Sequence, residues 1–108
     1  DVISIITNDG WWGNTAGHKQ HFSYSKLRAI EQKRAVVRSA NTGISGFINP
    51  LGEVREIAKW DEKQVIKSQV AICNTVTFYN QFGDYLGRIS SFISSIFILM
   101  ILVKSKIQ

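Results

Sequence analysis

Residues 2–13 of the chain read VISIITNDGWWG, and this stretch decides how the first part of the chain folds. It opens with a run of β-branched, apolar residues that stops at the Asn-Asp-Gly of residues 8–10, which predicts a short strand followed by a turn. Because the run is almost wholly apolar, we expect the strand to be buried on both faces, as in the centre of a sheet. Trp11 and Trp12 follow in a loop with glycines on both sides. A solvated turn has no use for two indoles, so we expect this loop to line a hydrophobic pocket.

Downstream of this loop the sequence alternates between helical and strand patterns. A helix is predicted from His18 to about Lys33, with Thr15 or Asn14 as its N-cap. Its inward face is expected to carry Phe22, Ala29 and Ile30. Strands are predicted over residues 35–40, 44–48, 53–60 and 65–72, with breaks at residues 41–43 and 49–52. A strand, a helix and then a meander of strands predict an α/β layered fold.

The last part of the chain is apolar enough to enter a membrane. Residues 89–103 carry no charged side chain. A helix of that length rises only about 22 Å, against a hydrocarbon core about 30 Å thick, so we expect residues 85–87 to lengthen the span. Lys104 and Lys106 follow directly, and basic residues at the end of an apolar segment indicate the cytoplasmic side. The alternative is a buried or interfacial helix.

These patterns predict a division of the chain into four parts. Residues 1–80 are expected to form the α/β domain and residues 81–88 a linker. Residues 89–103 are expected to form a transmembrane helix, followed by a cytoplasmic tail at residues 104–108.

The composition is that of a folded protein and excludes several functions. The chain has 108 residues, of which 44% are hydrophobic and 11% aromatic, so disorder is not expected. Its net charge of +5 is that of an ordinary solvated surface. The sequence has no basic cluster interleaved with aromatic residues, which is the pattern that would indicate nucleic-acid binding. A single cysteine, Cys73, excludes an internal disulfide, and its apolar neighbours favour a small packing residue over a nucleophile. No cofactor or metal is expected.

Several short motifs occur in a characteristic order along nearly the whole chain. They are NDGWWG at residues 8–13, Gln-His at 20–21, RAIE at 28–31, RSANTG at 38–43, PLG at 50–52 and GDY at 83–85. Together they resemble the apolipoprotein N-acyltransferases, which are membrane members of the nitrilase, or carbon–nitrogen hydrolase, superfamily. The chain departs from the usual pattern at three places. His18 stands where a proline is common, Ala35 stands where a proline is expected, and Phe78 replaces the proline of a Thr-Pro-Tyr motif.

The resemblance implies a fold, a location and a chemistry. The fold is a four-layer α-β-β-α sandwich set on transmembrane helices and facing the periplasm, in the bacterial inner membrane. In that chemistry a Glu acts as base, a Lys stabilises the oxyanion and a Cys thiolate takes the acyl group as a thioester. A phospholipid is the acyl donor, and the amine of a diacylglyceryl-modified N-terminal cysteine on an apolipoprotein is the acceptor.

The resemblance also implies that the catalytic residues lie outside this sequence. In the family all three precede the aromatic loop, so none of them maps onto this chain. The sequence also begins directly with a strand pattern, and its first residue is Asp1 and not a methionine. We therefore expect a C-terminal fragment, with no catalytic residue of its own.

Five residues are candidates for binding substrate: Asn8, Trp11, Trp12, His21 and Asn41. The two tryptophans are expected to line the acyl channel, where aromatic side chains contribute a large apolar area. The alternative for them is that one is a core residue. His21 is expected either to orient the loop or to be a structural hydrogen-bonding group. Asn41 is expected to hold the catalytic loop through its side chain. A structural ion network is expected among Arg28, Glu31, Arg34 and Arg38.

Two other functions remain open at this stage. One is a soluble nitrilase-type amidase, against which the apolar tail argues. The other is a non-catalytic, membrane-tethered module, which fits the absence of an activated nucleophile. A Cys-Tyr-Glu-like motif upstream of Asp1, preceded by several hydrophobic spans, would decide for the acyltransferase.

Overall fold

The computed structural model describes residues 1–107, and these form two units. The first, which we call the α/β unit, comprises Asp1–Thr77, and the second, the helical unit, begins at Phe78. Each unit is described by itself.

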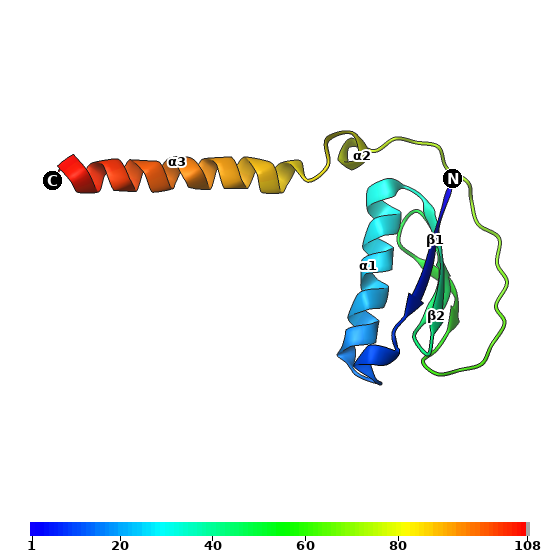
Figure 1. The fold of residues 1–108 in the computed structure, drawn as a ribbon. Helices are drawn as coiled ribbons and strands as arrows, with labels where there is room; N and C mark the ends of the chain where they lie inside the picture. The colour runs from blue at the N-terminus through cyan, green and yellow to red at the C-terminus, as the bar shows by residue number, and fades with distance from the viewer. Residues whose placement is uncertain (108) are drawn as a thin grey trace. The chain divides into compact units, whose positions relative to one another are not determined.

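The α/β unit contains a four-stranded sheet in the order β1-β2-β3-β4 (Figure 1). Strands β1 (Val2–Asn8) and β2 (Ala35–Asn41) are parallel, and the helix α1 (Ala16–Gln32) connects them. Strands β3 (Ser45–Ile48) and β4 (Val54–Ala58) continue the sheet with antiparallel pairing. The predicted α/β fold is therefore confirmed, and four of the five predicted strands are present.

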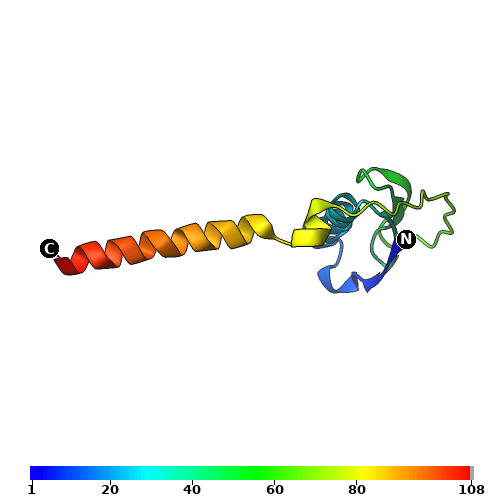
Figure 2. The ribbon, with the colours of Figure 1, turned by 90° about the horizontal axis from the view of Figure 1, so that it is seen from above.

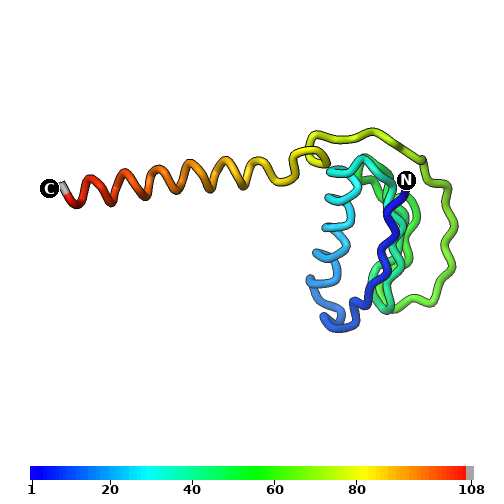
Figure 3. The backbone as a smooth tube through the Cα atoms, turned by 45° about the horizontal axis from the view of Figure 1, so that its top comes forward, coloured from blue at the N-terminus to red at the C-terminus, as the bar shows by residue number. Residues whose placement is uncertain are grey.

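Helix α1 lies along one face of the sheet (Figures 1 and 3). It begins two residues before the predicted start, and the Thr15 hydroxyl accepts a hydrogen bond from the Gly17 N–H at 3.2 Å, as expected of an N-cap. It ends at Gln32, and the C-cap residue Lys33 takes the left-handed conformation with φ 46°. The side chains of His18, Phe22, Ser25 and Ala29 are buried against the sheet.

The core of the α/β unit is small and lies between α1 and the sheet. Phe22 and Ala29 from the helix pack against Val36 and Ile48 from the strands, with Ile3 and Ile5 at the border. Fully burying one such aromatic or aliphatic side chain contributes about 1.5–3 kcal/mol. The prediction that Ile30 shares this face was wrong, because that side chain is 49% exposed. Two polar residues, His18 and Ser25, occupy buried positions of α1 at which an amphipathic helix usually has aliphatic side chains.

The prediction that β1 is buried on both faces was wrong, because the described residues cover only one of its faces. β1 is an edge strand of this sheet, and its residues alternate between half-buried and exposed. Ile3 and Ile5 face α1, whereas Ile6 is 87% exposed on the other face. An apolar run shows that a strand avoids water, but it does not show which elements cover its second face.

The predicted strand at residues 65–72 was also wrong. The chain there is drawn out along the side of the sheet opposite α1, without a ladder partner (Figures 1 and 3). It is tied down at its far end, where the Arg34 Nη1 donates to the Thr75 carbonyl at 2.7 Å. The β-branched pattern was typical of extended backbone. A strand additionally requires a neighbour with free N–H and C=O groups, which local sequence does not encode.

The helical unit consists of the short helix α2 (Phe78–Phe82) and the long helix α3 (Tyr85–Ile107). The Asp84 carboxylate accepts a hydrogen bond from the Gly87 N–H at 2.9 Å and so caps the start of α3. Figure 2 shows α3 as one unbroken helix. Within residues 1–107 it is the one helix long and apolar enough to cross a membrane, over the 22 residues Tyr85–Lys106. Such a helix is about 33 Å long, which matches the hydrocarbon core of a bilayer.

Candidate functional site at the carboxyl ends of the parallel strands

The aromatic loop follows β1 and forms a tight turn. The Asn8 Oδ1 accepts a hydrogen bond from the Gly10 N–H at 3.1 Å, and residues Gly10–Trp12 form one turn of 3-10 helix. Gly13 then reverses the chain with φ 55°, a conformation that favours glycine. The Thr15 hydroxyl donates to the Trp12 carbonyl at 2.8 Å and closes the turn onto the start of α1. The turn predicted from the Asn-Asp-Gly motif is therefore confirmed, and the hydrogen bond that closes it lies within the motif.

The two tryptophans of this loop have different surroundings. Trp11 is 83% exposed, and its side chain makes no ring contact or hydrogen bond within the described residues. Trp12 is 42% exposed and presents its ring to His21 at 5.0 Å between ring centroids, with the planes 60° apart. A Cβ atom on Gly17 would lie 2.8 Å from the Trp12 ring, so the indole packs directly on the helix backbone there. Neither tryptophan is a core residue of the α/β unit.

A buried carboxylate lies under this loop. Asp9 is fully buried, and its Oδ2 lies 2.7 Å from the Nη2 of Arg38, whose side chain is 1% exposed. The other oxygen, Oδ1, lies 2.8 Å from the His21 Nδ1 and accepts a hydrogen bond from the Thr7 hydroxyl at 3.1 Å. Arg38 also donates to the Ser25 hydroxyl at 2.9 Å. We call Asp9, Arg38, His21 and Ser25 the buried polar cluster; it joins the turn that follows β1 to α1 and β2.

The geometry assigns the tautomer of His21. Its Nδ1 lies 2.8 Å from the Asp9 carboxylate and 3.1 Å from the Arg38 Nη2. A carboxylate only accepts hydrogen bonds and a guanidinium only donates them, so one Nδ1 atom can serve only one of the two. The shorter distance favours a proton on Nδ1 that is donated to Asp9.

The cluster lowers the pKa of Asp9. Burial, the largest influence, would by itself raise the pKa of this carboxyl. The hydrogen bonds from His21 and Arg38, the charge of Arg38 and the hydrogen bond from Thr7 together outweigh burial, and the pKa falls below its usual value of 3.8. Asp9 is therefore ionised in the folded protein at neutral pH.

The lowered pKa predicts an acid-dependent loss of stability. The stabilisation from Asp9 is fully present above the unfolded-state pKa of 3.8 and is lost as the pH falls through the lower folded-state pKa. Urea unfolding of the full chain at neutral pH and below that pKa measures the loss, and Asp9→Asn should reduce it. The matched control is Asp61→Asn, an exposed carboxylate without an ion pair in residues 1–107, which should leave the loss in place. An unchanged acid response in Asp9→Asn would contradict the assignment.

The break after β2 packs against the same cluster. The parallel register pairs Asn8 with Asn41, so two candidate residues 33 positions apart in sequence become neighbours at the carboxyl ends of their strands. A Cβ atom on Gly43 would overlap the Asp9 carboxylate, which explains a glycine at that position. The Asn41 side chain is exposed and makes no hydrogen bond within the described chain. Contact with the aromatic loop comes from Thr42 and Gly43 instead.

The structure thus brings four of the five candidate residues to one edge of the sheet, and the fifth, Trp11, projects from it. Sequence reasoning missed Asp9, although it stands inside the decisive motif. The available signal was a charged residue, Arg38, at an inward position of β2, because a buried arginine requires an acidic partner. The spacing of 29 residues between the two gave no indication of the pairing.

The predicted ion network among four charged residues was wrong. Within the described residues Arg28 pairs only with Glu31, at 2.8 Å on the partly exposed side of α1. Arg34 donates to backbone carbonyls, and Arg38 belongs to the buried polar cluster. Three arginines on the same stretch of chain point in different directions because they lie on different elements, and helical spacing does not carry over into a strand.

The prediction that Cys73 is a small packing residue was wrong. The residue lies in the drawn-out segment after β4 and is partly exposed, since that segment forms no strand. Its thiol donates to the Thr75 hydroxyl at 3.2 Å. That contact, a backbone hydrogen bond and the nearby Arg34 and Lys33 lower the pKa of Cys73, despite some burial. Among the described residues no group of His, Cys, Asp and Glu could hold a metal ion.

The fold and the NDGWWG loop at the edge of its sheet define a class of protein. The carbon–nitrogen hydrolase family model matches residues 1–78, and the chain belongs to that family. Within it, the chain is similar to the apolipoprotein N-acyltransferase of Chlorobaculum tepidum, with 31% identity over 96% of the chain, and that of Rickettsia prowazekii, with 35% over 94%. The protein of the same name from Geobacter metallireducens is 37% identical over 77% of the chain. The resemblance inferred from the motifs is therefore confirmed.

The chain spans only part of these relatives. It covers 20% of the length of the Chlorobaculum and Rickettsia proteins and 16% of the Geobacter protein. The similarity to the first two extends through both units, because it includes nearly all of the chain.

Proposed function

We propose that the chain is the C-terminal part of a membrane apolipoprotein N-acyltransferase. The enzyme transfers a fatty acyl group from a phospholipid to the N-terminal amine of a diacylglyceryl-cysteine on an apolipoprotein, through a cysteine thioester. The observation that carries this proposal is the similarity to proteins of that name across the aromatic loop and α3 alike. No cofactor or nucleic acid has a part in it.

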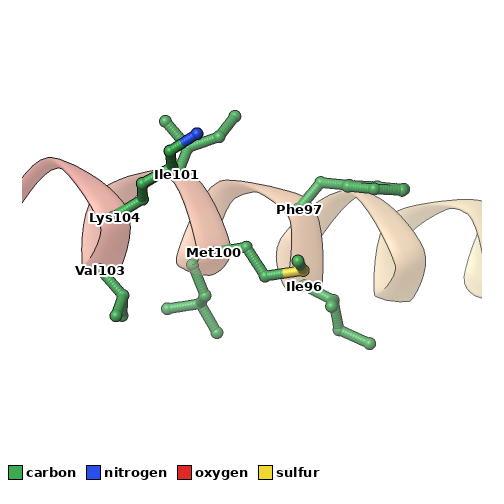
Figure 4. A pocket seen from close by; sticks show the side chains of 7 residues that line it. Ile96, Phe97, Met100, Ile101, Val103 and Lys104 are labelled. Atoms are coloured by element: carbon green, nitrogen blue, oxygen red, sulfur yellow. The ribbon is translucent and has the colours of Figure 1, made fainter.

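The proposal favours an acyltransferase over a soluble amidase because of α3. Its apolar side chains, among them Phe97, Met100 and Ile101, project around the helix and not from one stripe (Figure 4). A helix that is apolar on all sides suits a lipid environment, and a soluble amidase would gain nothing from it. We place the protein in the bacterial inner membrane with the α/β unit in the periplasm, and Lys104 and Lys106 on the cytoplasmic side.

We assign the aromatic loop to the substrate pocket. Asn8, Trp12, His21 and Asn41 gather at the carboxyl ends of two parallel strands, which is where ligands bind in open α/β sheets. Trp11 projects from the same loop with most of its indole exposed, as expected of a residue that meets an acyl chain supplied from elsewhere. The catalytic Cys, Glu and Lys are supplied by the part of the enzyme outside this chain.

The 108-residue chain by itself is expected to have no acyltransferase or amidase activity. The first step of transfer requires a thiolate that displaces a lysophospholipid, and the second requires an amine that displaces the thiolate. Cys73 is the one thiol of the chain, and no histidine or carboxylate of the described residues pairs with it. Incubation with radiolabelled phospholipid in detergent, followed by hydroxylamine treatment, measures thioester formation.

The control for this experiment is Cys73→Ser, which removes the thiol and leaves the fold of the drawn-out segment unchanged. A hydroxylamine-sensitive label that Cys73→Ser abolishes would overturn the assignment of an inactive fragment and would favour a separate thiol chemistry.

Trp11→Ala and Trp12→Ala in the complete protein should each slow acyl transfer about tenfold or more, which corresponds to about 1.4 kcal/mol of lost transition-state binding. Thermal unfolding should stay nearly unchanged for Trp11→Ala, because that indole is 83% exposed. The matched control is Trp60→Ala, whose ring packs on the buried His18 at 4.3 Å and which should lower stability more than transfer. Loss of folded protein in proportion to lost activity in both loop variants would make the loop structural.

A further inference from the structure

We propose that His21 is a positioning residue that acts through Trp12, and that Asp9 and Arg38 hold its ring in place. This inference rests on the proposed function, because it states how the aromatic loop is set for the acyl chain. It differs from a direct role of His21 in binding, since the substrate would meet Trp12 and not the imidazole.

The first step of the argument is that the His21 ring is fixed on one side. Its Nδ1 donates to Asp9 at 2.8 Å, and the Arg38 guanidinium lies 3.1 Å from the same atom. Both partners are buried, with exposed side-chain fractions of 0% and 1%. A ring whose inner nitrogen is held by an ion pair inside the protein has one orientation available to it.

The second step is that Trp12 rests on that ring. The indole meets the imidazole edge-on at 5.0 Å and meets the helix backbone at Gly17, where a Cβ atom would lie 2.8 Å from it. These two contacts come from one helix and leave 42% of Trp12 exposed on the outer side. Trp11 has no such support within residues 1–107. The structure therefore distinguishes a held tryptophan from a free one.

The third step is that the loop backbone alone does not determine the Trp12 side chain. The Thr15 hydroxyl holds the Trp12 carbonyl at 2.8 Å, which fixes the turn. The turn does not itself set the rotation of the indole about its side-chain bonds, and the contacts that the described residues make with the indole are those with Gly17 and His21. The orientation of the pocket wall thus depends on the buried polar cluster.

A double-mutant cycle in the complete protein tests this dependence. His21→Asn keeps an amide that can donate to Asp9 but removes the ring from Trp12. We expect it to raise the KM for a phosphatidylethanolamine donor about tenfold with little change in kcat, within the range known for misplaced binding groups. In a Trp12→Ala background the same substitution should change the KM no further. Effects that multiply in the double variant would overturn the inference, because His21 would then act independently of Trp12.

A spectroscopic measurement gives a readout independent of catalysis. In protein labelled with 5-fluorotryptophan, the fluorine resonance that disappears in Trp12→Phe belongs to Trp12. His21→Asn should shift this resonance. His18→Asn is the matched control, because His18 packs on Trp60 at 4.3 Å, and it should shift the Trp60 resonance alone. A Trp12 resonance that stays in place in His21→Asn would overturn the inference.

The two measurements separate this inference from the proposed function. If Trp12→Ala leaves the rate of acyl transfer unchanged, the pocket assignment fails. The fluorine shift then still decides whether His21 orients Trp12.

Discussion

Arg38→Met in the full chain is expected to lower the free energy of unfolding of the α/β unit by about 3–5 kcal/mol. The reason is that the substitution leaves the Asp9 carboxylate buried without its 2.7 Å partner, in a place that water does not reach. It also leaves the Ser25 hydroxyl and the Ile44 carbonyl without their donors. Urea denaturation followed by the circular dichroism of the sheet measures the change.

Two variants control this experiment. Arg28→Met breaks the exposed pair with Glu31 and should cost less than about 1 kcal/mol, because solvent screens it. The double variant Asp9→Asn with Arg38→Met should be more stable than the sum of its single effects, since it removes both members of the buried pair. Equal costs for Arg28→Met and Arg38→Met would show that burial of the pair has no energetic consequence.

Ile96→Asp is expected to reduce membrane insertion of α3 by about 3 kcal/mol, which corresponds to roughly a 100-fold change in the equilibrium. Ile96 lies near the middle of the candidate span Tyr85–Lys106, and the residues three and four positions away from it on the helix, Phe92, Ile93, Leu99 and Met100, are all apolar. Fractionation of cells that express the chain, followed by alkaline extraction of the membranes, measures the change. The control is Ser105→Asp at the end of the span, which should insert normally. Equal extraction of both variants would argue against a span.

The same helix predicts an orientation that can be tested separately. In a Cys73→Ser background, a Ser105→Cys probe should react with a membrane-impermeant thiol reagent only after the inner membrane is opened. The adjacent Lys104 and Lys106 are the reason, because basic residues stay on the cytoplasmic side. Labelling from the periplasm in intact cells would reverse the assigned topology and with it the periplasmic position of the α/β unit.

Local sequence predicted most elements of this fold, because the signals that define them are local. Thr15 caps α1 through a neighbouring N–H, and the Asn-Asp-Gly turn closes through Asn8 and Gly10. The strands that became β1 to β4 have β-branched runs and turn residues at their ends. Where a prediction depended on a distant partner it was wrong, as for the strand expected at residues 65–72 and the second covered face of β1.

The sequence by itself determined the aromatic loop, the α1 helix, the apolar helix at the end and the family to which the motifs point. Only the tertiary structure decided how the candidate site is held together. Asp9 meets His21 across 12 residues and Arg38 across 29, and the parallel register places Asn8 beside Asn41. Such contacts depend on how α1 packs against the sheet and on which strands pair. The residues that make these contacts are ordinary in their own neighbourhoods, so no local pattern contains them.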